Sequence, residues 1–530
     1  MNPVPVSALA LVGVIAVAFG QRLQGLQAPA SPGTDAAFVR FFQARAPSEV
    51  AAASDAIVES GIGFDEALKR LRQGRVYSAD VRRGFVQASY RAEGGDEYFY
   101  ALDVPEAYDP ARTYQVRVQL HGGVGRVEAS APREGGALGR LPGAEQIYVM
   151  PSAWRDAPWW SRRQVENLHA ILDSVKRTYN VDENRVVLSG VSDGGTGAYY
   201  VAMRNPTPFA SVLPLNGFIL VLRNETSDAD GDLFPNNLVN RPFFIVNGGR
   251  DPLYPTSVVD PYVAQLKNGG VDLVYRPQPN AGHDTSWWPD VKDEFERFVT
   301  DHPRRPLPDK LSWEAGPPNL PSRASWLVID RLGAIGSDDP ALPDVNRMST
   351  PAVPDFGMRG TGTRANRVLS GSNADRMGLR SGDVVVRINN QPTTPGTDVV
   401  EVLRGFPLGR PLLLTVTRGG ESVRVTGRYE PTVLPGDADA MLSRQSGSGR
   451  VDLVRTGNRV DVKSRGVAAF TLLLSPDAFD MMRPVTVVVN GRTAFEGTVR
   501  RDIRTLLEWS ARDNDRTMLF AAALHVDVPH

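Results

Sequence analysis

The sequence of 530 residues contains no cysteine and only six histidines. Nucleophilic thiols, disulfides and thiolate metal sites are therefore all excluded. An excess of charge of one sign is also missing, since 59 Lys and Arg residues stand against 60 Asp and Glu residues. A balanced chain has no net field that would attract nucleic acid or an anionic membrane, so neither is expected as a partner. Chemistry that needs an imidazole must use His121, His169, His283, His302, His525 or His530.

An apolar run stands near the start of the chain, at Val4–Phe19, and ends in the small-x-small pattern Ala18-Phe19-Gly20. This pattern predicts a signal peptide over residues 1–20, although no Lys or Arg precedes the run. A membrane anchor is the alternative, but about sixteen residues is at or below the lower limit for spanning a bilayer. We therefore expect an exported protein, periplasmic or extracellular, with an N-terminal anchor as the alternative and no stable membrane span.

The chain is too long for one ordinary hydrophobic core, and its 42% hydrophobic and 22% charged residues are typical of globular proteins. Changes in pattern along the sequence predict several regions. They are a leader with a small helical lead-in (21–84), a catalytic domain (85–302), a β-rich split domain (309–350 plus 447–530) and an inserted module (354–432).

Short apolar runs alternate with helical segments from residue 85 to residue 302. Such alternation predicts an α/β fold, with a mostly parallel sheet and helices on both faces. Ligands of an open parallel sheet bind beyond the carboxyl ends of its strands. The expected strands are Tyr114–Leu120, Gln146–Met150, Arg185–Ser189, Ala210–Leu215, Phe243–Val246 and Asp272–Tyr275, and the expected helices are Ser161–Tyr179, Gly194–Arg204, Val259–Asn268 and Pro289–Thr300.

The strongest chemical signal is Gly190-Val191-Ser192-Asp193-Gly194, between an expected strand and an expected helix. A serine on a sharp strand-to-helix turn needs glycine two residues to either side, because a Cβ there would collide with the neighbouring backbone. The helix that follows aims its amide dipoles at a developing oxyanion. The pattern predicts Ser192 as a nucleophile; the alternative is a glycine-rich turn with an idle serine.

A serine nucleophile needs a base and a carboxylate that holds the base in one tautomer. His283 follows the last expected strand, where a loop can bring it over the serine. Asp251 lies in the loop after Phe243–Val246 and gives the order Ser–Asp–His that α/β-hydrolases share. Asp284 is the rival carboxylate, but it adjoins the base in sequence and cannot easily reach its far nitrogen.

Donors for an oxyanion are expected from glycines that follow the first expected strand of the catalytic domain, in Leu120-His121-Gly122-Gly123. The backbone N–H groups of Gly122 and Gly123 are candidates, together with the N–H of Asp193. His121 is expected to orient the loop through hydrogen bonds.

Aromatic pairs flank these loops. Trp159, Trp160 and Trp287 are candidates for the walls of a substrate pocket, with packing in the core as the equal alternative.

These motifs, together with Asn247–Pro255 and Gly282–Pro289, resemble secreted bacterial α/β-hydrolase esterases. The nearest groups are the polyhydroxybutyrate-depolymerase-like, feruloyl-esterase-like and esterase-D-like proteins. The resemblance covers about 85–302 and implies a carboxylic ester hydrolase. It places nucleophile, acid and base on Ser192, Asp251 and His283. The chain departs from many secreted members in having no cysteine pairs.

Residues 354–432 resemble a PDZ domain of the bacterial type. Ala374 to Asp383 is similar to the pattern Ala-x-x-Ala-Gly-Leu-x-x-Gly-Asp, with Met377 in place of the second alanine. Phe356-Gly357-Met358 is similar to the carboxylate-binding loop, and Val399–Leu403 would line the groove. The resemblance implies a groove that adds an extended peptide to a sheet edge and often captures its C-terminal carboxylate. The alternative is a PDZ fold that serves only as a spacer or lid.

The expected function is a serine esterase that acts on a small or polymer-linked ester through an acyl-enzyme, with a C-terminal peptide as the PDZ ligand. A serine peptidase and a scaffold that acts through the PDZ groove are the alternatives. The proposed chemistry requires no metal and no organic cofactor.

Overall fold

The computed structural model describes residues 32–92, 95–126, 129–134, 141–223, 229, 231–349, 353–434, 438–444 and 446–529. The predicted signal peptide over 1–20 lies outside these residues. The chain divides into two compact units, Met1–Val76 with Arg500–Ala522 and Tyr77–Val499 with Ala523–His530. Among the described residues, no helix is long and apolar enough to cross a bilayer.

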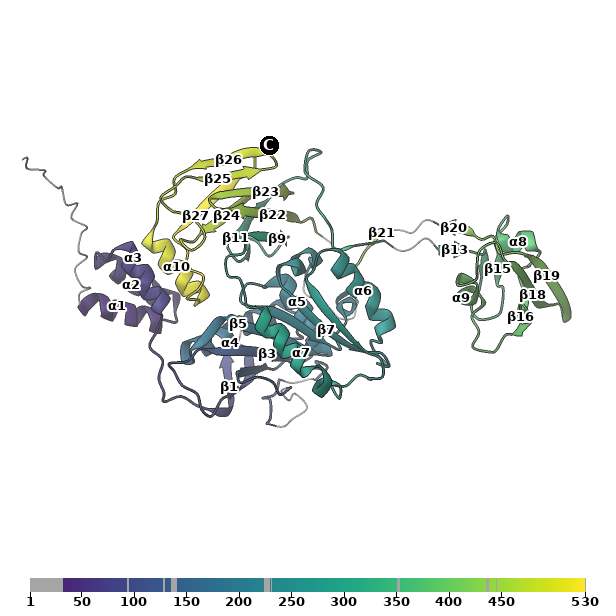
Figure 1. Cartoon of the computed structure of the whole chain (residues 1–530), viewed down its shortest axis with the longest axis horizontal. Coiled ribbons are helices and arrows are strands. Elements are labelled where there is room, and N and C mark those ends of the chain that lie inside the picture. Colours follow the sequence, from purple (N-terminus) through teal and green to yellow (C-terminus); the bar gives the residue numbers. More distant parts are fainter. Residues whose placement is uncertain are drawn as a thin grey trace, which may run out of the picture. The chain divides into compact units, whose positions relative to one another are not determined.

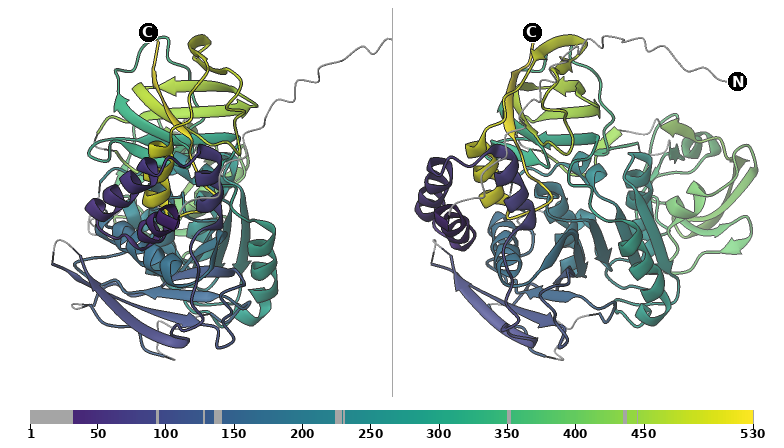
Figure 2. Two further views of the ribbon diagram at one scale, coloured as in Figure 1. Left: turned by 90° about the vertical axis from the view of Figure 1, so that its left-hand side faces the viewer. Right: turned by 60° about the vertical axis from the view of Figure 1, so that its left-hand side comes forward.

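The smaller unit is helical. Its helices are α1 (Pro32–Gln43), α2 (Pro47–Glu59), α3 (Phe64–Gln73) and α10 (Ile503–Asp513). The purple N-terminal helices and the yellow α10 lie side by side in both views of Figure 2. Leu506 and Leu507 of α10 are buried in one apolar cluster with Leu68 and Leu71 of α3, so α10 groups with these helices although it lies within the predicted β-rich region. The predicted domain boundaries stay predictions.

The larger unit is built around an eight-stranded sheet (Figure 1), which is antiparallel at β1, β2 and β4 and parallel from there on. With strand order β1-β2-β4-β3-β5-β6-β7-β8, this is the α/β-hydrolase fold, as predicted. The strands are β1 (Gly84–Arg91), β2 (Glu97–Val104), β3 (Tyr114–Leu120), β4 (Ile147–Pro151), β5 (Val181–Val191), β6 (Ser211–Leu215), β7 (Phe243–Gly248) and β8 (Leu273–Gln278).

Helices cover both faces of this sheet, which is why almost every residue of β3, β4, β6 and β7 is buried. On β7, Phe243 and Ile245 join the cluster that holds α4 (Arg162–Thr178), α5 (Asp193–Arg204) and α6 (Thr256–Asn268). Phe244 and Val246 point the other way and join the cluster of α7 (Trp288–Asp301). A short 3₁₀ turn, η1 (Ile219–Arg223), follows β6.

A β-rich region follows the hydrolase fold and forms two sheets. One has the order β26-β25-β23-β22-β9 and the other the order β10-β11-β24-β27. Asn490 and Gly491 link β25 to β26 with φ of 50° and 83°, the two positive values that a type I′ turn needs. The strands are β9 (Lys310–Ala315), β10 (Ser322–Ala324), β11 (Leu327–Leu332), β22 (Gly449–Thr456), β23 (Arg459–Arg465), β24 (Val467–Leu474), β25 (Val485–Val489), β26 (Arg492–Gly497) and β27 (Ala522–Asp527).

Asparagine side chains join the hydrolase fold to β9. They come from the 3₁₀ turn η3 (Pro235–Asn240). Asn237 exchanges two hydrogen bonds with the backbone of Glu314, at 2.9 and 2.8 Å, and Asn240 exchanges two with Ser312, at 2.6 and 3.2 Å. Because Ser312 and Glu314 are two residues apart, the amides reproduce the pairing of a neighbouring strand.

The inserted module leaves and returns through paired strands, β12 (Arg347–Ser349) with β21 (Ala438–Ala440) and β13 (Val353–Asp355) with β20 (Thr432–Leu434). Its core contains Phe356, Leu379, Val399 and Leu414, all buried. The remaining elements are β14 (Met358–Arg359), β15 (Arg367–Val368), α8 (Asn373–Met377), β16 (Val384–Ile388), β17 (Gln391–Pro392), α9 (Val399–Arg404), β18 (Pro411–Arg418) and β19 (Glu421–Arg428).

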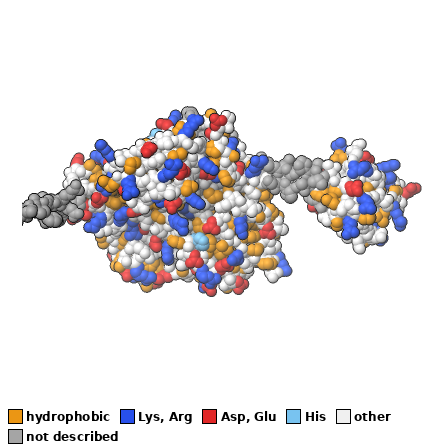
Figure 3. All heavy atoms as spheres, turned by 45° about the horizontal axis from the view of Figure 1, so that its top comes forward, with side chains coloured by type: hydrophobic (Ala, Val, Ile, Leu, Met, Phe, Trp, Pro, Cys, Tyr) orange, Lys and Arg blue, Asp and Glu red, His pale blue; other side chains and the backbone are white. Residues whose placement is uncertain are grey.

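Positive and negative side chains are interspersed over the described residues on the face shown in Figure 3. The basic and acidic residues, which are nearly equal in number in the whole chain, are therefore not separated into patches of one sign on this face.

Candidate active site

Ser192 lies at the sharp turn between β5 and α5. Its φ is 56° and its ψ is −120°, a strained conformation for a residue with a side chain. A Cβ on Gly190 would lie 2.1 Å from the carbonyl oxygen of Gly194, and a Cβ on Gly194 would lie 2.2 Å from that of Leu120. The two flanking glycines are therefore required by backbone contact.

Ser192, His283 and Asp251 form one chain of hydrogen bonds. The distance from His283 Nε2 to Ser192 Oγ is 2.8 Å, and the distance from His283 Nδ1 to Asp251 Oδ2 is 2.6 Å. The Asp251 side chain is fully buried and that of His283 is 21% exposed. Oδ1 of Asp251 accepts hydrogen bonds from the backbone N–H groups of Leu253 and Tyr254, at 2.8 and 3.0 Å. These bonds fix the orientation of the carboxylate.

Asp284, the rival carboxylate, is engaged elsewhere. Its Oδ1 accepts hydrogen bonds from the hydroxyl and the backbone N–H of Ser286. These bonds lower the pKa of Asp284. The backbone carbonyl of Asp284 accepts a 2.7 Å hydrogen bond from the side-chain amide of Asn216, at the end of β6. Asp284 thus caps its own loop, and Asn216 holds that loop beside the nucleophile.

The predicted oxyanion loop runs directly against the nucleophile. A Cβ on Gly122 would lie 3.0 Å from Cβ of Ser192, and Gly123 has a φ of 70°. The backbone N–H of Val124 donates a 2.9 Å hydrogen bond to Oδ2 of Asp193. Gly122 and Asp193 are therefore brought together at Ser192, and Gly123 is the next residue of the same loop; the roles of all three as oxyanion donors stay predictions.

His121 is buried and holds this loop in place. Its Nδ1–H donates to the carbonyl oxygen of Gly122 at 2.8 Å, and its Nε2 accepts from the backbone N–H of Ala153 at 3.0 Å. Burial lowers the pKa of His121 to about 4, so the ring is neutral at pH 7. The carbonyl of His121 accepts a 2.8 Å hydrogen bond from the indole of Trp159.

The three predicted pocket tryptophans are buried, with exposed fractions of 0% for Trp159, 6% for Trp160 and 4% for Trp287. They pack in the apolar clusters on the two faces of the sheet. Of the two alternatives for these residues, burial favours packing in the core.

Another aromatic side chain, that of Tyr254, contacts the base, and Phe218 packs against it. The ring of Tyr254 meets the ring of His283 edge to face, at 5.7 Å between centroids, and the ring of Phe218 lies 5.6 Å from that of Tyr254. Both side chains are half-buried. Sequence reasoning missed them, although Tyr254 comes three residues after Asp251 in the same loop. Burial raises the pKa of Tyr254, and the carboxylates of Asp193 and Asp251 raise it further.

The predicted PDZ loop lies between β13 and β14. Gly357 has a φ of 90°, and a Cβ there would lie 2.1 Å from Cβ of Ser372. Phe356 and Met358 are buried on either side of it. Glycine is therefore required at the centre of this loop, whose role in binding a carboxylate stays a prediction.

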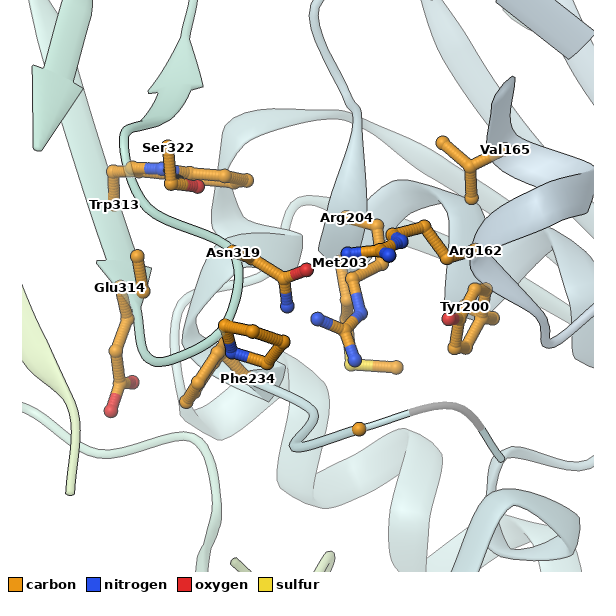
Figure 4. Close-up of a pocket in the computed structure, with 13 residues that line it drawn as sticks. Arg162, Val165, Tyr200, Met203, Arg204, Phe234, Trp313, Glu314, Asn319 and Ser322 are labelled. Atoms are coloured by element: carbon orange, nitrogen blue, oxygen red, sulfur yellow. Dashed lines mark hydrogen bonds between the residues drawn. The ribbon is translucent and has the colours of Figure 1, made fainter. Parts of the chain in front are cut away.

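A cavity of about 210 Å³ lies among α4, α5 and β9 (Figure 4). Arg162, Arg204 and Trp313 are among its lining residues, and none of the predicted site residues lines it. Within the ranges that the structure describes, no three His, Asp or Glu residues come together as a metal site.

Comparison with known proteins identifies one part of the chain. Residues 364–418 match the PDZ domain family. Serine protease HTRA4 of Mus musculus is 30% identical over 134 residues, which are 25% of this chain and 24% of that protein. The chain thus spans about a quarter of the length of this curated relative.

Two solved structures are similar at low identity. A ferulic acid esterase is 19% identical, covers 42% of this chain and 99% of its own, and has a TM-score of 0.33. An S-formylglutathione hydrolase from Agrobacterium tumefaciens is 14% identical, covers 43% and 99%, and has a TM-score of 0.34.

Proposed function

We propose that this chain is a serine hydrolase that cleaves carboxylic esters through an acyl-enzyme intermediate. The observation that carries the proposal is the hydrogen-bonded chain Ser192–His283–Asp251, with its serine against the backbone of Gly122. A serine is a weak nucleophile at neutral pH, and this arrangement supplies the base that it needs.

In the first step, Oγ of Ser192 attacks the ester carbonyl carbon while Nε2 of His283 takes the hydroxyl proton. Asp251 accepts a hydrogen bond from Nδ1 and stabilises the imidazolium that forms. The negative charge on the carbonyl oxygen is stabilised by the backbone N–H groups of Gly122 or Gly123 and of Asp193. His283 then gives its proton to the departing alcohol oxygen, which leaves the acyl group on Ser192.

In the second step, His283 takes a proton from water, whose oxygen attacks the acyl carbon. The tetrahedral species collapses, the carboxylic acid leaves, and the proton returns to Ser192 through Nε2. Every proton transfer runs between Ser192, His283, water and the substrate, so this chemistry calls for no metal or organic cofactor. The half-buried Phe218 and Tyr254 beside the base offer apolar surface to one side of the ester.

The test is the hydrolysis of p-nitrophenyl acetate and butyrate by the full chain. Ser192→Ala is expected to abolish turnover and to abolish labelling by a fluorophosphonate probe. Efficient cleavage of peptide amides without cleavage of esters would reverse the choice of substrate. An unlabelled Ser192 in the folded protein would remove the hydrolase proposal itself.

A serine peptidase is the second candidate, because the curated relative of Mus musculus is a serine protease. A panel of peptide p-nitroanilides and p-nitrophenyl esters, assayed in parallel, distinguishes the two activities. Loss of both activities in Ser192→Ala would assign them to the same site.

We also propose that the module over 354–432 binds an extended peptide by strand addition. Support comes from the match of residues 364–418 to the PDZ domain family and from the position of β14, which pairs with β15 along one side. The resemblance implies a C-terminal peptide as the ligand. A scaffold protein would show this binding without turnover, so esterase assays on the same preparation separate the two functions.

We propose, in addition, that residues 1–20 direct export and are removed. The apolar run and the small residues after it support this proposal. N-terminal sequencing of the protein from its native source is expected to begin after Gly20, whereas an intact Met1 would favour the N-terminal anchor.

A further inference from the structure

The loop at the end of the proposed peptide groove already holds a carboxylate of this chain. The backbone N–H of Gly357 donates a 2.9 Å hydrogen bond to Oδ1 of Asp355. Arg359 binds the same carboxylate through both of its Nη atoms, at 2.8 Å each. The central amide of the loop and the nearest cation are thus both engaged by Asp355.

This carboxylate is an anion across the neutral range. The Arg359 guanidinium lowers the pKa of Asp355 below its usual value, and the hydrogen bond from Gly357 lowers it further. The Asp355 side chain is only 16% exposed, whereas that of Arg359 is 48% exposed. The carboxylate of the ion pair is therefore partly shielded from solvent, while the guanidinium is more exposed. Hydrogen bonds between charged groups of this kind are strong.

The loop around Asp355 is held on both sides. The carbonyl of Phe356 accepts a 2.9 Å hydrogen bond from the N–H of Ala374, and the carbonyl of Gly357 accepts one of 2.9 Å from Leu369. Ser372 lies behind Gly357 so closely that no Cβ would fit there. Moving this loop to release its amide would break several backbone hydrogen bonds at once.

The helix α9, which is predicted to line the groove, is largely apolar, with Glu401 and Arg404 as its charged residues. Val399 and Leu403 of α9 are buried in the core of the module and fix the helix, while Val402 is 46% exposed. Among the described residues, β14 is paired with β15 alone. A peptide strand beside β14 would therefore meet the backbone hydrogen-bonding groups of this strand and the side chain of Arg359, which is already bound to Asp355.

We propose that Asp355 is a built-in substitute for the carboxylate of a peptide, and that the groove selects an internal extended segment over a chain end. A free C-terminus would have to displace the Asp355 carboxylate from Gly357 and Arg359. Because Asp355 belongs to the same chain as these groups, its effective concentration at them is high. A C-terminus that failed to displace it would meet a like charge. An internal segment brings no carboxylate to this point and continues past the loop. This inference rests on the proposed peptide-binding function.

The test uses the full-length protein and two displayed libraries of random heptapeptides, one with free C-termini and one flanked on both sides by linker. The wild-type protein is expected to enrich peptides from the flanked library. Asp355→Ala, which releases the Gly357 amide and Arg359, is expected to bind free-carboxylate peptides about tenfold more tightly than the wild type does, in proportion to a charge-assisted hydrogen bond. Amidation of those peptides should remove the gain.

Glu421→Ala is the matched control, because it removes one exposed acidic charge at the start of β19, on a different strand from the loop. It is expected to behave as the wild type does. Wild-type enrichment of free C-termini, with loss of affinity on amidation, would overturn the inference and leave peptide binding intact. No gain in Asp355→Ala would also overturn it. A failure of all variants to enrich either library would instead remove the peptide-binding function.

Discussion

The backbone N–H of Val124 donates a 2.9 Å hydrogen bond to Oδ2 of Asp193, the residue directly after Ser192. The bond ties the glycine loop to the first turn of α5. Asp193 therefore has two roles in the proposed site. Its own N–H is a predicted oxyanion donor, and its carboxylate holds the loop that carries the other predicted donors, Gly122 and Gly123. Misplacing such donors by a fraction of an ångström is costly, because they act only at the position where charge develops.

Asp193→Ala is expected to lower kcat on p-nitrophenyl acetate by about 10- to 100-fold with little change in KM, since the loop loses its anchor. Asp193→Asn keeps an acceptor for the Val124 N–H and is expected to stay within about threefold of the wild type. Steady-state kinetics of both variants make the check. Equal losses in both would assign the effect to the charge of Asp193 instead of the hydrogen bond.

The carboxylate pair Asp251 and Asp284 allows a matched comparison beside the same base. Asp251→Asn is expected to lower kcat by about 10⁴-fold, because an amide cannot hold the required tautomer of His283. Asp284→Asn is expected to stay within about threefold, since its carboxylate bonds Ser286 and not the imidazole. A large loss in Asp284→Asn with a small one in Asp251→Asn would exchange their roles.

The glycines of the nucleophile turn are expected to be indispensable for folding. Gly190→Ala places a methyl group 2.1 Å from a backbone oxygen that cannot move aside, so we expect a loss of at least about 3 kcal/mol in the free energy of unfolding. Gly125→Ala is the control, because a Cβ at Gly125 meets nothing within 4 Å. Urea denaturation followed by tryptophan fluorescence compares the two variants, and equal midpoints would contradict the steric argument.

His121 is expected to make the hydrolase fold sensitive to acid. Its pKa is about 4 in the folded chain and about 6.5 when unfolded, so the unfolded state binds more protons between these values. Stability is therefore complete above pH 6.5 and falls as the pH drops toward 4, by up to about 3 kcal/mol. The unfolding free energy of the wild type should fall more steeply over this range than that of His121→Asn. Parallel curves would show that His121 titrates normally.

Much of the sheet could be predicted because its central strands are buried on both faces. For this reason β4, β6 and β7 read largely as apolar runs. β3 begins and ends at the predicted residues, although Gln115, Arg117 and Gln119 alternate with its apolar residues. The hairpin of β1 and β2 was not predicted. Val86 is the only fully buried residue of β1, so the strand lacks a clear apolar pattern. Pairing with β2 along its whole length, and not burial, keeps it extended.

The meeting of Ser192, Asp251 and His283 could be predicted because each follows a strand of one parallel sheet, and parallel strands end at the same edge. The surroundings of these residues could not be predicted in the same way. Whether a tryptophan lines a pocket or fills the core depends on packing from distant segments. The hydrogen bond between Asp355 and Gly357 is local in sequence, but its proposed effect on peptide binding depends on the position of their loop in the folded module.

The asparagines of η3 have a consequence for the behaviour of the protein in concentrated solution. β9 is an outer strand of its sheet, and outer strands recruit further strands from other molecules. Asn237 and Asn240 occupy backbone groups of β9 to which a second molecule would bind, so we expect them to block the growth of cross-β aggregates from this side. Replacing both with alanine is expected to promote self-association, which light scattering would detect, without affecting the proposed chemistry at Ser192 in the molecules that do not associate.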